Sequence, residues 1–183
     1  MDLPKPVAIG IGAVMLAVGV WQISRGLKEC NGTTDLEWSK QRATSVDVGD
    51  FNIKIPPGWR DAAESGNQKM KDLLAKQPGA HVLVREEFDA EMVILKAAPN
   101  EPITGAPPCD ELANTLAKAE GSTASAITVQ TYNGDPGCRW NAGKGEVHLQ
   151  YNVRFHGPSV FLVACSGDGA ICTQVLAGVT AKK

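Results

Sequence analysis

The chain has 183 residues and a formal net charge of −2, and 43% of its residues are hydrophobic, 21% charged and 5% aromatic. These proportions are those of an ordinary globular protein. Lysine and arginine do not cluster, and there are few aromatic residues to stack on bases, so the composition excludes a nucleic-acid-binding protein.

The chain begins with an apolar segment, residues 6–23 (PVAIGIGAVMLAVGVWQI), that carries no charged side chain. A helix needs about 20 apolar residues to cross a bilayer, where only a helix satisfies every backbone group. Trp21 suits the interfacial position near the end of such a span. We therefore predict an N-terminal membrane anchor in residues 1–24, a tether in residues 25–48, and one domain in residues 49–183.

A cleaved signal peptide is the alternative. Lys5 would form its positive region, residues 7–16 its apolar region, and Ala17-Val-Gly19 its cleavage site. The apolar run continues beyond Gly19, which favours an uncleaved anchor. Arg25 and Lys28 follow the segment, so the positive-inside rule favours a cytoplasmic body, whereas the cysteines favour an extracytoplasmic one.

All five cysteines follow the apolar segment, and in a domain of this size they indicate disulfides in an oxidising compartment. Cys165 and Cys172 bracket a Ser-Gly-Asp-Gly turn and are natural partners. Cys109 and Cys138 would then pair and close a loop worth about 3–4 kcal/mol in the chain-entropy model. Cys30 remains near the membrane, where it would link two copies of the chain. The alternatives are five reduced thiols in a cytoplasmic body, and a zinc site whose cysteine spacing fits no known finger or ribbon.

The first half of the body begins with a strand over residues 51–55, in which Phe51, Ile53 and Ile55 point one way, and Pro56-Pro57-Gly58 ends it. The elements expected next are a helix over residues 62–77, two hairpin strands over 81–88 and 91–97, and a proline-rich loop over 99–108.

In the second half we expect a helix over residues 110–120, strands over 126–132, 145–156 and 159–165, and a closing helix over 170–179. The clearest alternation lies in residues 145–156, so one face of that strand is buried and the other meets water or a partner. The candidate binding face on this strand consists of His148, Gln150, Asn152 and Arg154. Consecutive strands with helices before, between and after them predict an α+β fold with an antiparallel sheet.

The segment Phe51-Asn-Ile-Lys-Ile-Pro-Pro-Gly-Trp59 resembles the opening of PsbP-like domains, in which an aromatic-led strand ends in a Gly-Trp corner. The resemblance covers residues 48 to the end and implies an α/β/α sandwich. It also implies membership of a largely non-enzymatic superfamily that includes photosystem II extrinsic proteins and bacterial envelope lipoproteins. No family site residues carry over, because Gly58 and Trp59 look structural.

Other motifs have simpler structural interpretations. Gly143-Lys144-Gly145 departs from a phosphate-binding loop in both spacing and the missing Ser/Thr, which indicates a hairpin turn. His148 and His156 lie roughly 26 Å apart at about 3.3 Å per residue, too far to share a metal. An acidic run is typical of a solvated hairpin tip, although it is also the one candidate for calcium or paired-carboxylate chemistry. Its members are Glu86, Glu87, Asp89 and Glu91.

These observations predict a membrane-anchored, extracytoplasmic binding or scaffold protein without enzymatic activity, cofactor or metal. Its partner would be another envelope protein, bound through the candidate face or the loop over residues 99–108. One alternative is a membrane-tethered hydrolase or metal-dependent enzyme that uses Glu86, Asp89 or His81. The other is a secretion or membrane-protein chaperone, which requires an exposed apolar groove.

Overall fold

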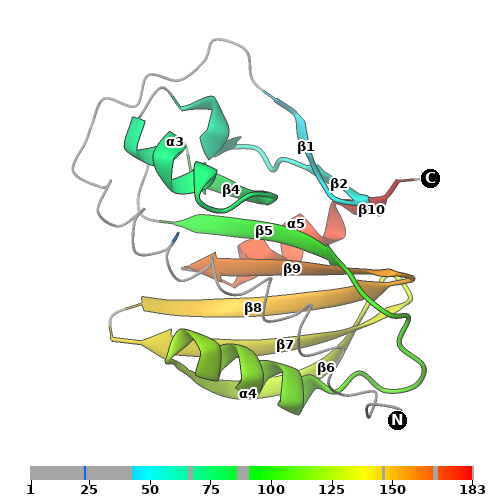
Figure 1. Cartoon of the computed structure of the whole chain (residues 1–183). Coiled ribbons are helices and arrows are strands. Elements are labelled where there is room, and N and C mark those ends of the chain that lie inside the picture. The colour runs from blue at the N-terminus through cyan, green and yellow to red at the C-terminus, as the bar shows by residue number, and fades with distance from the viewer. Residues whose placement is uncertain are drawn as a thin grey trace.

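The computed structural model describes residues 23, 43–65, 68–85, 91–145, 147–166 and 169–182, and its main feature is one large antiparallel sheet (Figure 1). The sheet has seven strands in the order β3-β4-β5-β9-β8-β7-β6. Its strands are β3 (Trp59–Asp61), β4 (Ala80–Arg85), β5 (Met92–Pro99), β6 (Thr123–Tyr132), β7 (Asp135–Lys144), β8 (Val147–His156) and β9 (Ser159–Ser166).

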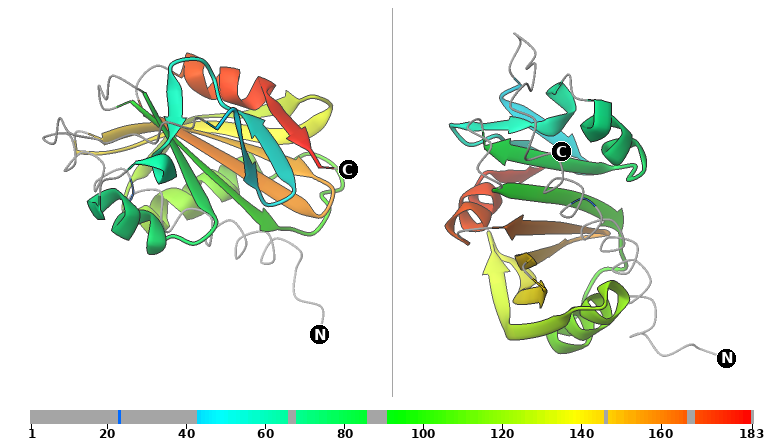
Figure 2. Two further views of the ribbon diagram at one scale, coloured as in Figure 1. Left: turned by 90° about the horizontal axis from the view of Figure 1, so that it is seen from above. Right: turned by 90° about the vertical axis from the view of Figure 1, so that its left-hand side faces the viewer.

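A second, smaller sheet and the helices cover the large sheet. The small sheet has the order β1-β2-β10, with β1 (Ser45–Val48), β2 (Phe51–Lys54) and β10 (Val179–Ala181). The helical elements are η1 (Ala62–Glu64), α3 (Gln68–Ala75), α4 (Cys109–Glu120) and α5 (Ala170–Ala177). Figure 2 shows α3 and α4 on one side of the large sheet, and α5 with the small sheet on the other. The fold is therefore α+β and layered, as predicted.

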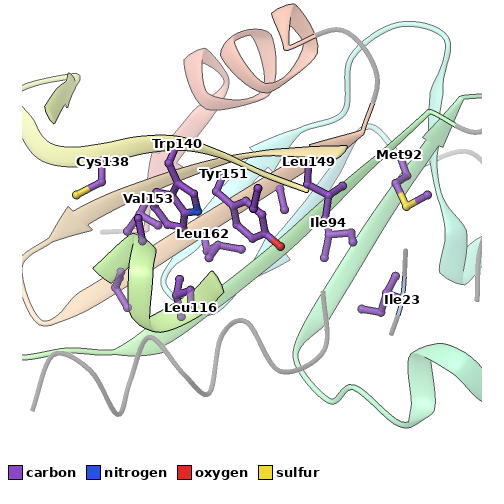
Figure 3. Packing of buried hydrophobic residues seen from close by; sticks show 14 of the residues in the cluster. Ile23, Met92, Ile94, Leu116, Cys138, Trp140, Leu149, Tyr151, Val153 and Leu162 are labelled. Atoms are coloured by element: carbon purple, nitrogen blue, oxygen red, sulfur yellow. The ribbon is translucent and has the colours of Figure 1, made fainter. Parts of the chain in front are cut away.

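Each face of the large sheet carries its own apolar core. The first core joins α4 and Met70 of α3 to one face, and in it the Trp140 and Tyr151 rings stack with centroids 5.2 Å apart (Figure 3). The second core joins α5 and the small sheet to the other face through Phe51, Phe161 and Val175. Every residue of β9 except the last is buried, because this central strand is covered on both sides.

Ile23, the last residue of the apolar N-terminal segment, belongs to the first core. It is helical and 0% exposed, and it lies near Met92 and Ile94 in Figure 3. The remainder of the predicted anchor, and the predicted tether up to residue 42, lie outside the described residues. Within the described part of the chain, no helix is long and apolar enough to cross a membrane. Ile23 thus packs into the hydrophobic core of the domain that follows it in the chain.

We expect Ile23→Ala to lower the free energy of unfolding by about 2 kcal/mol, because it removes a buried side chain and leaves a cavity. Urea unfolding of the full chain measures this. Val129→Ala is the matched control, since Val129 is 60% exposed and its truncation should change stability by less than about 0.5 kcal/mol. Equal effects of the two substitutions would contradict the packing of Ile23 into the core.

Both predicted disulfides are present. Cys109–Cys138 ties the first residue of α4 to β7, and Cys165–Cys172 ties the end of β9 to α5. All four cysteines are at most 4% exposed. The structure confirms the pairing that the turn between Cys165 and Cys172 predicted. Cys30 lies outside the described residues.

Several local predictions differ from the structure. The closing helix expected over residues 170–179 ends at Ala177, and Val179–Ala181 form β10. The helix expected over residues 62–77 forms as η1 and α3, whose described residues are 62–64 and 68–75. Residues 45–48, assigned to the tether, form β1 and pair with β2. Strand β7, which was not predicted, occupies residues 135–144 and pairs with both β6 and β8. The sequence did not indicate this strand because the segment contains proline and glycine, which are both depleted in strands.

Candidate functional site

The candidate binding face belongs to a polar half-face of the large sheet formed by β6, β7 and β8. On this side, α5 packs against β9 and β2, and β1 packs against β4 and β5. Cross-strand pairs bring polar side chains of the three strands together in rows: Asn141 faces Gln150, and Arg139 faces Asn152. The members of the polar half-face are Ser125, Thr128, Gln130, Tyr132, Asp135, Arg139, Asn141, His148, Gln150, Asn152, Arg154 and His156.

One end of this half-face is an internal ion-pair network. The Arg154 guanidinium donates to Asp135 Oδ2 at 2.6 Å and to the Val179 carbonyl at 3.4 Å. The same carboxylate oxygen lies 2.8 Å from His156 Nδ1. The guanidinium also lies 6.0 Å from the Phe51 ring centroid, a cation–π distance. Arg154 is only 5% exposed. Its contacts join β8, the strand that carries it, to β7, β2 and β10.

In the middle of the polar half-face, too, a polar side chain is bonded to another residue of the same domain. Asn152 is 2% exposed, and its Oδ1 accepts a hydrogen bond from the Tyr132 hydroxyl at 3.0 Å. The Tyr132 ring lies across Gly137, where a Cβ would come within 2.5 Å of the ring. Burial raises the pKa of Tyr132 to about 12, so it remains a hydrogen-bond donor at neutral pH. Asn152 and Arg154 were expected to meet solvent, and in the structure distant segments cover them.

The other end of the half-face holds a pocket of about 420 Å³. His148 and Gln150 of β8 line it together with Asn141 of β7 and Ser125 of β6. Main chain and small residues complete its wall, including Gly169, which precedes α5. The disulfide supports this wall, because Cys165 pairs with Gln150 across the strands and Cys172 Sγ lies 3.6 Å from the Gln150 carbonyl oxygen. Two of the four predicted residues therefore share a pocket.

The four polar side chains that line the pocket are available for binding. Within the part of the chain that the structure describes, Ser125, Asn141, His148 and Gln150 form no side-chain hydrogen bond or ion pair. Among the described residues, no lysine, arginine, aspartate or glutamate lines the pocket. Hydroxyl, amide and imidazole groups both donate and accept hydrogen bonds. The pocket therefore suits an uncharged group that presents both donors and acceptors.

Sequence reasoning missed Ser125 and Asn141. Asn141 lies on β7, the strand hidden by its proline and glycines. Ser125 precedes a bulge in β6, where the register shifts before Thr128 and Ala126 has a positive φ of 52°. The bulge breaks the alternation from which the face of Ser125 could have been inferred.

The remaining candidates do not join this pocket. Glu86, Glu87 and Asp89 lie outside the described residues, and Glu91 pairs with Arg85 at 2.8 Å. His81 Nδ1 lies 3.4 Å from Asp61 Oδ2. No group of three potential metal ligands occurs among the described residues.

The Gly143-Lys144-Gly145 motif lies at the β7–β8 hairpin. Gly145 has a positive φ of 60° there, as expected for a turn. The Lys144 ammonium donates to the Glu120 carbonyl at the end of α4, at 3.3 Å. The motif thus closes a hairpin and contacts α4.

No protein-family model matches this chain, and no curated protein matches it. Among solved structures, the chain is similar to the solution structure of cyanobacterial PsbP (CyanoP) from Synechocystis sp. PCC 6803, with 14% sequence identity and a TM-score of 0.48. That match covers 77% of this chain and 91% of the cyanobacterial protein. A Bacteroides thetaiotaomicron crystal structure matches with 11% identity and a TM-score of 0.39 over 78% of this chain and half of that one. Both likenesses concern the fold alone.

Proposed function

We propose that this chain is a non-enzymatic binding protein whose body lies outside the cytoplasm, held at the membrane by the part of the predicted anchor (residues 6–23) that precedes the buried Ile23. It binds an uncharged hydrogen-bonding group of another envelope component in the pocket formed by Ser125, Asn141, His148 and Gln150. The observation that carries the proposal is the contrast along one sheet face. Arg154 and Asn152 Oδ1 are bonded within the fold, whereas the four pocket side chains form no hydrogen bond or ion pair among the described residues.

The disulfides support the proposed compartment, because disulfides persist in oxidising environments and not in the cytoplasm. The proposed membrane position fits the proposed mode of action. A site of low affinity suffices when anchoring keeps the protein and its partner at a high local concentration.

The two alternative functions find less support. A hydrolase would need carboxylates or histidines gathered in a pocket, and the described pocket contains one histidine and no carboxylate. A chaperone would need an exposed apolar groove. Among the described residues, Val129 is the only exposed large hydrophobic side chain.

The binding site can be tested with a photocrosslinking amino acid in place of His148 in membranes of intact cells. We expect a discrete crosslinked adduct, and none from the same amino acid in place of Gln174, an exposed residue of α5. Adding Asn141→Ala and Gln150→Ala should reduce the adduct about tenfold, because each lost hydrogen bond costs about 0.5–1.5 kcal/mol. The same adduct from both positions, or no adduct from position 148, would refute the site.

The compartment is tested separately with Gln174→Cys and a maleimide that does not cross membranes. Labelling of this exposed thiol in intact cells, or in cells with only the outer barrier opened, is the expected result. Labelling that requires lysis of the inner membrane would place the body in the cytoplasm. The Cys30→Ser background removes the one cysteine that the described disulfides leave unpaired.

A further inference from the structure

Strand β6 is a long edge of the large sheet. It is the last strand in the sheet order, and it runs for 10 residues from Thr123 to Tyr132, whereas the strand at the opposite edge, β3, has three. An edge strand presents a row of backbone N–H and C=O groups without strand partners, which can pair with another chain. Such an edge is therefore an interaction surface unless something blocks it.

Two of the devices that block edge pairing are missing from β6, although α4 packs against one face of the strand. Its sequence, TASAITVQTY, contains no charged residue and no proline. One device is present, the bulge between Ser125 and Thr128, which interrupts the first half of the strand. Beyond it, residues 128–132 pair with β7 without a further register shift.

An exposed apolar side chain lies on this regular stretch. Val129 is 60% exposed, and it is the only exposed large hydrophobic side chain among the described residues. Its neighbours Thr128 and Thr131 are also exposed. Val and Thr are β-branched and favour strand pairing. The stretch thus combines strand propensity, an exposed apolar residue and no charge.

We propose that a second copy of this chain pairs antiparallel with β6 through residues 128–132, so that two large sheets join into one and the two Val129 side chains meet across the seam. A two-fold axis at the seam produces an antiparallel pair of identical segments, which matches the antiparallel pairing throughout the large sheet. Because the segment carries no charge, two copies do not repel each other. Each copy also supplies the apolar side chain that the other covers.

This pairing has a consequence for binding. Directly opposed residues in an antiparallel pair lie on the same face of the sheet. With Val129 opposite Val129, the polar half-faces of the two copies form one continuous surface, and both pockets open on the same side. Two pockets on one surface bind a repetitive partner with greater avidity than one pocket.

The test measures the mass of the full chain in detergent over a concentration series, in a Cys30→Ser background that excludes a disulfide through Cys30. We expect a monomer–dimer equilibrium. Val129→Lys should weaken it at least about tenfold, because a lysine at an edge position opposes strand pairing. Gln174→Lys is the matched control, since it adds the same charge to an exposed position on α5 and should leave the equilibrium unchanged.

A second measurement does not depend on equal stability of the variants. In the same background, Val129→Cys should form an intermolecular disulfide under mild oxidation, and Gln174→Cys should not. A monomer at every concentration overturns the proposal. So does a dimer that Val129→Lys and Gln174→Lys affect equally, or equal crosslinking from positions 129 and 174.

Discussion

Replacing Cys109 and Cys138 together by serine is expected to lower the free energy of unfolding by about 3–4 kcal/mol. The two residues are 29 positions apart, and a disulfide that closes a loop of this length removes about that much conformational freedom from the unfolded chain. The bond also fastens the first turn of α4 to β7, beside Leu112 and Leu116 of the first core. Urea unfolding with a common m-value measures the change.

The second disulfide provides the matched control. Cys165 and Cys172 are only 7 positions apart, so replacing both by serine should cost about 2 kcal/mol in the same chain-entropy model. Both pairs are buried, and in both the serines replace buried sulfur, so the comparison isolates loop length. A larger loss from the shorter loop would contradict the entropic explanation.

Stability should decline by about 3 kcal/mol as the pH rises from 4.5 to 8 because of Glu120. This carboxyl group lies at the end of α4, is 9% exposed, and accepts a hydrogen bond from the Tyr151 hydroxyl at 2.8 Å through Oε2. Its Oε1 is buried and has no partner among the described residues. Burial raises the pKa of Glu120 from 4.5 to about 7, against the lowering effect of the Tyr151 hydrogen bond.

The direction of the pH effect follows from this pKa. The folded state holds a proton on Glu120 that the unfolded state releases above pH 4.5, so folding is favoured most below that pH. The advantage is lost as the pH rises through about 7, where the folded carboxyl group ionises in its buried position. A raised pKa of this size corresponds to about 3 kcal/mol.

Glu120→Gln separates this group from every other titrating residue. Glutamine is neutral at all pH values and has nearly the same shape, so the variant should lose most of the decline and be more stable than the natural chain at pH 8. Asp110→Asn, an exposed carboxylate on the same helix, is the control and should leave the decline in place. A variant Glu120→Gln with the same pH profile as the natural chain would contradict the buried position of the carboxyl group. Thermal unfolding at constant ionic strength across pH 4.5–8 measures all three proteins.

Where a property depends on neighbouring residues, the sequence predicted it well. Alternation in residues 145–156 predicts a strand because side chains point to opposite faces at a period of two, and β8 occupies Val147–His156. The turn between Cys165 and Cys172 predicts their disulfide because a short loop holds its ends together. The apolar stripe at Leu112 and Leu116 predicts helix α4, and Gly121 ends it in the left-handed conformation with a φ of 65°.

Where a property depends on segments that are distant in the sequence, the sequence did not predict it. Strand β7 contains a proline and glycines that disfavour strands locally, yet hydrogen bonds to β6 and β8 on both sides hold it in the sheet. Gly137 is even required there, since the Tyr132 ring occupies the space that a Cβ would need.

The candidate binding face shows the same division. The sequence alone determined the strand, the polar character of one of its faces and the Cys165–Cys172 pair, because these follow from local periodicity and spacing, whereas Cys109–Cys138 was predicted only as the pair that remained. Only the tertiary structure decided which polar residues reach solvent. Tyr132, Asp135 and Val179 come from other strands to bond Asn152 and Arg154, whereas Gln150 meets Asn141 across an open pocket. The position of a polar side chain in a strand determines the face on which it lies. Whether that side chain finds a hydrogen-bond partner depends on segments from elsewhere in the chain.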